Sequence, residues 1–155
     1  MYLHKKQVTM NNHTVSRTIQ INAPKEAVWD ALTNPEKTKE YFFHCEVLSD
    51  WQKGSTITFK GKMFWVINVE LTGEILDIHP GNLLKYTLTN GHNKDDNPNN
   101  FSTITDSLTE HNGVTTLSIL DDVGSAEGFE ERVEKSEQGW DKVLKGLKKL
   151  VEEGS

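Results

Sequence analysis

Histidines are the first residues in this 155-residue chain that could bind a metal or move a proton. They are His4, His13, His44, His79, His92 and His111. Each stands alone, and none forms the His-Glu-x-x-His pattern that places two zinc ligands on one helix face. We therefore predict no metal site, no cofactor and no catalytic residue.

The polar segment 95–106 is a second candidate for metal binding. Asp95, Asn97, Asn99 and Asp106 occupy positions one, three, five and twelve of a calcium-binding loop. The glycine required at position six is replaced by Asn100, and the flanking sequence predicts strands rather than helices. A solvated loop is the better interpretation.

Two further residues could act chemically. His44 and Cys45 are neighbours, but adjacent side chains on a strand point to opposite faces, so a small structural cysteine is favoured over a nucleophile with its base. Arg17 shares the alternation of Val15 and Ile19 and is expected to point inward. Two interpretations stay open: an ion pair with a carboxylate at the end of the sheet, or a polar group that orients a ligand.

Large apolar side chains suggest a binding cavity more strongly than any polar group suggests catalysis. Each aromatic residue alone is best explained by core packing, whereas the set favours a pocket with a few polar groups, such as Tyr86 and Thr103. The candidate cavity residues are Phe43, Trp51, Phe59, Trp65, Tyr86, Phe101, Thr103, Phe129, Trp140 and Leu144.

Composition limits the partners. The formal net charge of −6 opposes general attraction to nucleic acid. No apolar run approaches the length of a membrane span, so membrane insertion is not expected. A single cysteine and no export signal predict a soluble cytoplasmic protein.

The elements that must position these residues follow from periodicity. Residues 1–13 predict a flexible arm, and residues 14–153 one domain. A strand at 15–21 precedes two short helices, the second capped by Asn34. Alternating segments then predict further antiparallel strands, giving six or seven, with a hairpin at Asn112-Gly113. An amphipathic helix from Phe129 to Val151 ends the domain, so the fold class is α+β.

Several local strings within this layout resemble one family. They include Ala23-Pro24, Val28–Glu36, Asp50-Trp51, Gly73–Leu76, Leu84–Thr87, Val114–Leu117 and Gly139-Trp140. They resemble the START-like, or SRPBCC, superfamily, in its bacterial branch similar to the C-terminal domain of the heat-shock protein 90 ATPase activator. The resemblance implies a helix-grip fold, a curved antiparallel sheet around the long C-terminal helix with an internal cavity that binds lipids, polyketides or flavonoid-like molecules.

Three functions are compatible with this resemblance. We expect non-catalytic binding of a small hydrophobic molecule in the cavity between sheet and helix. An enzyme of the cyclase or hydrolase type would need a titratable group in the same cavity, from Arg17, Glu74, Asp77 or Tyr86. A chaperone co-regulator would use a surface interface, although the activator's separate chaperone-binding domain has no counterpart in this chain. The oligomeric state is left open.

Overall fold

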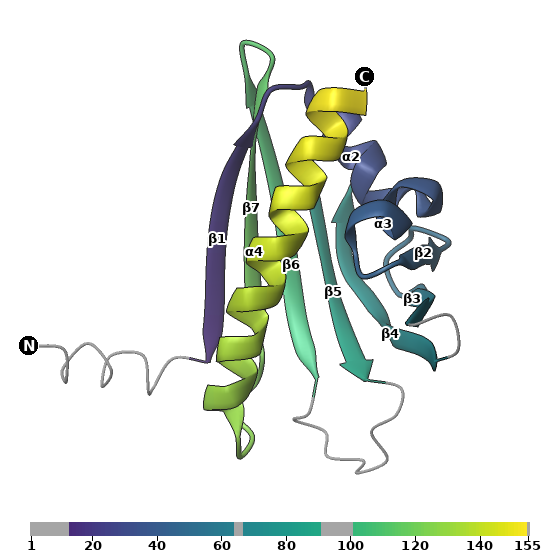
Figure 1. Cartoon of the computed structure of the whole chain (residues 1–155), viewed down its shortest axis with the longest axis vertical. Helices are drawn as coiled ribbons and strands as arrows, with labels where there is room; N and C mark the ends of the chain where they lie inside the picture. Colours follow the sequence, from purple (N-terminus) through teal and green to yellow (C-terminus); the bar gives the residue numbers. More distant parts are fainter. Residues whose placement is uncertain (1–12, 64–66, 91–100, 155) are drawn as a thin grey trace, which may run out of the picture.

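A single sheet and three helices make up the part of the chain that the computed structural model describes, residues 13–63, 67–90 and 101–154 (Figure 1). In chain order the elements are β1 (Thr14–Ile21), α2 (Lys25–Thr33), α3 (Pro35–Tyr41), β2 (Cys45–Ser49), β3 (Thr56–Met63), β4 (Ile67–His79), β5 (Leu83–Asn90), β6 (Ser102–His111), β7 (Val114–Asp122) and α4 (Phe129–Gly154). This order confirms the predicted α+β helix-grip fold.

The sheet is antiparallel, with the strand order β1-β7-β6-β5-β4-β3-β2. It curves, and α4 runs across its concave face, while α3 stands beside the β2 edge and α2 lies between α3 and the C-terminal end of α4 (Figure 1). Strand β1 closes the other edge by pairing with β7, with Thr18 opposite Ser118. The sheet and α4 are therefore the two layers between which the core lies.

The hairpin of β6 and β7 forms the part of the sheet between β1 and β5. Asn112 and Gly113 have φ values of 53° and 80°, the left-handed conformation required by a two-residue turn, so the predicted hairpin is confirmed. Alternation then buries Ile104 and Leu108 on β6 and Leu117 and Ile119 on β7.

Helices α2 and α3 place an aromatic cluster above β2 and β3. The Asn34 side chain accepts a hydrogen bond from the Glu36 backbone N–H at 3.0 Å, which confirms the predicted cap. The Tyr41 hydroxyl donates to the Ala31 carbonyl at 2.7 Å and so ties the two helices together. Phe42, directly after α3, is consequently held against the core.

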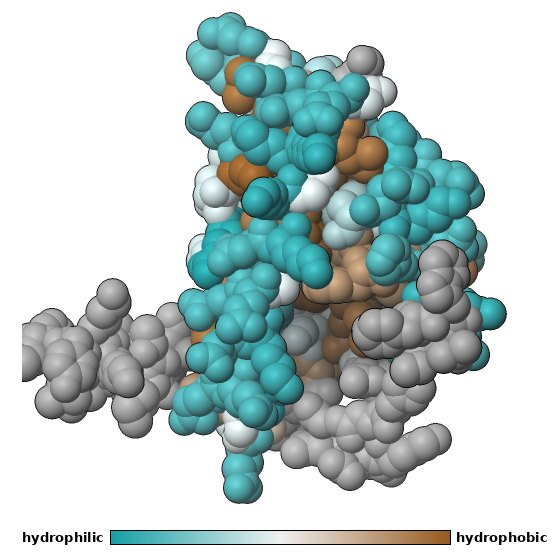
Figure 2. All heavy atoms as spheres, viewed as in Figure 1, coloured by the Kyte–Doolittle hydropathy of each residue, from teal (hydrophilic) through white to brown (hydrophobic). Residues whose placement is uncertain are grey.

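Helix α4 buries one stripe and exposes the other. Its buried residues are Trp140, Val143, Leu144, Leu147 and Val151. The opposite face is charged, as the hydrophilic surface of the helix shows (Figure 2). Among the described helices, none combines the length and the apolar character that a membrane crossing requires.

Candidate functional site

A cavity of about 360 Å³ lies between α4, the concave face of the sheet and the segment that follows α3. Apolar side chains form most of its wall: Phe42, Phe43, Leu71, Leu88, Phe101, Ile104, Val123, Trp140 and Val143. Figure 2 shows hydrophobic residues gathered in the hollow beside α4. A wall of this kind favours an apolar ligand.

The lack of a side chain at Gly139 keeps space open on the α4 side of the cavity. A Cβ atom built on Gly139 would lie 3.7 Å from Phe43 Cζ, which is ordinary contact, so a larger side chain would extend into the cavity. Phe43 itself has a left-handed φ of 50° and is 43% exposed. An aromatic ring is thus left partly open to solvent at the cavity border.

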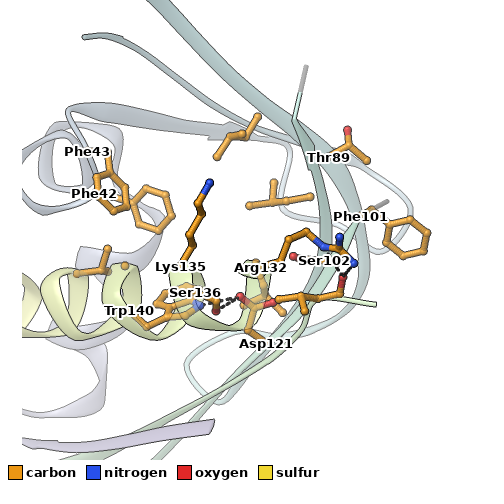
Figure 3. A pocket seen from close by; sticks show the side chains of 16 residues that line it. Phe42, Phe43, Thr89, Phe101, Ser102, Asp121, Arg132, Lys135, Ser136 and Trp140 are labelled. Atoms are coloured by element: carbon orange, nitrogen blue, oxygen red, sulfur yellow. Dashed lines mark hydrogen bonds between the residues drawn. The ribbon is translucent and has the colours of Figure 1, made fainter. Parts of the chain in front are cut away.

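Asp121, near the end of β7, is the buried charged group of the cavity. Its Oδ2 accepts hydrogen bonds from Trp140 Nε1 at 2.8 Å and from Ser136 Oγ at 2.7 Å (Figure 3). Its Oδ1 has no hydrogen-bond partner within the described residues. Burial raises the pKa of the Asp121 carboxyl, and the hydrogen bonds from Trp140 and Ser136 counteract part of that rise.

Two cationic side chains of α4 also line the cavity. The Arg132 guanidinium donates to the backbone carbonyls of Ala126 at 3.2 Å and Glu127 at 3.1 Å, and so holds the loop that leads into α4. The Lys135 side chain extends across the cavity toward the side where Phe42 lies (Figure 3). The electrostatic environment of a bound ligand therefore combines one carboxyl with two cations.

A much smaller space of about 20 Å³ lies deeper, bordered by Tyr86 and Asp106. Phe42 and Trp140 border both spaces, and the Phe42 ring stacks on Phe59 with centroids 4.6 Å apart. Asp106 is 3% exposed, and burial, with a smaller contribution from Asp121, raises its pKa to about 8. A space of this size holds about one water molecule, which is too little for a ligand.

The structure brings several of the predicted cavity residues together. Phe43, Phe101 and Trp140 line the larger cavity. Phe59, Tyr86 and Leu144 border the deeper space instead. Trp65 lies outside the described residues. The aromatic set therefore divides between a ligand-sized cavity and the core behind it.

Other predicted residues lie away from both spaces. Thr103 points to the opposite face of β6, because it alternates with Ile104, and Ser102 takes the cavity position. Trp51 has a φ of 57° in the turn between β2 and β3 and packs against the core from there. Phe129, at the first turn of α4, meets the His13 ring edge-on with centroids 6.2 Å apart.

Arg17 forms an ion pair rather than reaching the cavity. Its Nε donates to Asp141 Oδ1 at 2.7 Å, and its Nη2 lies 3.8 Å from Glu137 Oε2, so it links β1 to α4. The hydrogen bond to Asp141 raises the pKa of the guanidinium. Of the two interpretations that the sequence left open, the contacts correspond to the ion pair.

Sequence reasoning missed the two buried carboxyls. Asp106 shares the alternation of Ile104 and Leu108, and Asp121 that of Leu117 and Ile119. The alternation of buried and exposed side chains along each strand could have revealed them, because it places both acidic residues on the concave face.

The titratable residues that the sequence suggested for an enzyme, Arg17, Glu74, Asp77 and Tyr86, do not line the larger cavity. Glu74 is exposed, and Asp77 lies 3.5 Å from His79 near the end of β4, away from the cavity lining. No cluster of three or more His, Cys, Asp or Glu side chains within the described ranges could hold a metal ion.

Several solved structures share this architecture. ChR145 from Cytophaga hutchinsonii is 35% identical, with a TM-score of 0.74 over 91% of this chain and 94% of that chain. MLL2253 from Mesorhizobium loti is 25% identical, with a TM-score of 0.75 over 92% and 98%. DynU16, from the dynemicin biosynthetic locus, is 19% identical, with a TM-score of 0.73 over 93% and 49%. A comparison with curated proteins gave no match.

A family model covers most of the chain. Residues 22–152 match the model described as Activator of Hsp90 ATPase homolog 1-like protein, and this range contains α2, α3, β2–β7 and most of α4. The fold of this family is compatible with binding a hydrophobic ligand. The chain therefore belongs to the family of Activator of Hsp90 ATPase homolog 1-like proteins.

Proposed function

We propose that this protein binds a small, largely apolar molecule, without chemical change, in the cavity between α4 and the concave face of the sheet. The observation that carries the proposal is the 360 Å³ space walled by apolar side chains from α4, β4, β5 and β6 and from the segment after α3. Its volume lies within the range of about 300–1,000 Å³ that is usual for small-molecule sites.

Burial of apolar surface would supply most of the affinity. A ligand that loses about 200 Å² of apolar surface to the cavity gains roughly 5 kcal/mol at about 25 cal/mol per Å². The stacked Phe42 and Phe59 rings and the buried Trp140 give the inner end of the cavity a rigid aromatic boundary. A rigid wall reduces the ordering that binding would otherwise require.

The decisive experiment fills the cavity from the helix. Gly139→Leu would project a side chain into the space, whereas Gln138→Leu adds the same group at an exposed position of the same helix turn. Isothermal titration of the wild-type protein with lauric acid and with 2-naphthol should show saturable binding of at least one probe. Gly139→Leu should weaken that binding at least about tenfold, and Gln138→Leu should leave it unchanged.

Two results would contradict the proposal. One is failure of the wild-type protein to bind any member of a wider panel of fatty acids and naphthols. The other is equal binding by Gly139→Leu and the wild-type protein, because the probe would then occupy a different surface. A cooperative thermal transition in each variant confirms that it is folded.

A further inference from the structure

Asp121, one of the residues that line the cavity, holds an unused hydrogen-bond acceptor. The residue is 5% exposed, and its Oδ1 is enclosed without a partner in the described part of the chain. Leaving a buried acceptor unpaired is unfavourable, because the oxygen has lost water and gained no donor. A ligand that supplies the missing donor would remove this penalty.

The carboxylate cannot easily turn to satisfy its free oxygen. Both Trp140 Nε1 and Ser136 Oγ hold Oδ2, and these two donors lie one turn apart on α4 (Figure 3). The Trp140 ring is fixed in turn by its edge-on contact with Phe42, with centroids 6.1 Å apart. On the strand side, Asp121 is paired with Val15 of β1 and Ile104 of β6. Its position is therefore set before any ligand arrives.

The charges around Asp121 restrict what kind of donor can approach. Arg132 and Lys135 line the same cavity and oppose a cationic ligand. The Asp121 carboxylate opposes an anionic group at its own position. A neutral hydroxyl avoids both conflicts, and it can donate to an ionised carboxyl or accept from a protonated one.

We propose that the ligand of this cavity is a neutral apolar molecule carrying a hydroxyl group, a phenol or an alcohol, that hydrogen-bonds to Oδ1 of Asp121. The proposal rests on the proposed function and names the ligand class for the same cavity. The apolar wall takes the body of the molecule, and Asp121 fixes its orientation.

The test compares 2-naphthol with 2-methoxynaphthalene, which has the same ring system and lacks the donor. The wild-type protein should bind 2-naphthol about tenfold more tightly, which corresponds to about 1.4 kcal/mol. In Asp121→Asn, Trp140 and Ser136 would hold the amide oxygen, so an NH₂ group would replace the acceptor. Because an NH₂ group can donate equally to a hydroxyl or to an ether oxygen, the preference should disappear.

Asp122→Asn is the matched control. Asp122 is the next residue on β7, its side chain points away from Asp121, and its Oδ1 lies 2.6 Å from His13 Nδ1. This variant should keep the wild-type preference. If Asp121→Asn does not unfold cooperatively, Asp121→Ala replaces it, since removal of both oxygens should also bring the ratio of the two dissociation constants toward one.

The outcomes separate the two proposals. Equal binding of 2-naphthol and its ether by the wild-type protein overturns the hydroxyl proposal and leaves the apolar binding function standing. A preference that persists in folded Asp121→Asn or Asp121→Ala also overturns it. Binding of neither probe by the wild-type protein, together with failure of the wider panel, overturns both.

Discussion

Asp106 should make the free energy of unfolding fall as the pH rises. In the folded protein its pKa is raised to about 8, first by burial and then by Asp121, from a usual value of 3.8. The folded state therefore holds the proton more tightly than the unfolded chain. This contribution to stability is fully present below about pH 3.8 and is lost progressively as the pH rises to about 8.

The magnitude follows from the same two values. A change from 3.8 to about 8 corresponds to at most roughly 5 to 6 kcal/mol, at about 1.4 kcal/mol for each pH unit. Asp106 is 3% exposed, so solvent screening is small. Tyr41, Tyr86 and Asp121 face it, and the raised pKa of each tyrosine shows that this environment disfavours negative charge generally.

Urea unfolding of the wild-type protein and Asp106→Asn at pH 5, 7 and 9 measures the effect. The amide has a similar shape and stays neutral, so the variant should gain several kcal/mol relative to the wild-type protein between pH 5 and pH 9. Asp50→Asn changes an exposed carboxyl and should leave the pH dependence as it is. The reasoning fails if the difference between Asp106→Asn and the wild-type protein is the same at pH 5 and pH 9.

Four substitutions test other contacts through the same unfolding measurement. Gly139→Ala should stabilise the protein by about 0.5–1 kcal/mol, because alanine favours the helix and its Cβ would meet only Phe43 Cζ, at 3.7 Å. Gly146→Ala should destabilise the protein, since its Cβ would lie 3.0 Å from Tyr41 Cβ. A stability ranking of these two in the reverse order would contradict the packing. Trp140→Phe removes one donor from Asp121 and should lower stability by about 1–3 kcal/mol, whereas no loss would mean that Asp121 finds another partner. Asn34→Ala removes the cap of α3 and should lower stability by about 1 kcal/mol, unless water replaces the bond to Glu36.

The fold could be predicted from the sequence because its signals are local. Asn112-Gly113 specifies its hairpin through backbone conformation alone, and Asn34 marks the start of α3 through a bond to a residue two positions away. The stripe that includes Trp140 and Leu144 has the helical period, so α4 follows directly. Each of these features depends on neighbours in the chain.

The site could be predicted only in part, because it depends on where separate elements meet. The alternation of side chains along β6 correctly separates its two faces. It does not say which face is concave, and so Thr103 was predicted to line the cavity where Ser102 does. Phe129 is the first residue of α4, and its ring contacts His13 instead of lining the cavity. Asp121 becomes notable only when Ser136 and Trp140 converge on it from another element.

The pairing of β1 with β7 also constrains how the chain can fold. Thr18 and Ser118 face each other although 100 residues separate them, so β1 lacks its sheet neighbour until the final hairpin has formed. Closing such a distant contact has an entropic cost that must be met before the contact stabilises anything. Folding should therefore be slow for a domain of this size, on the order of milliseconds to seconds. During synthesis, β1 must wait with an unpaired edge until β7 emerges from the ribosome.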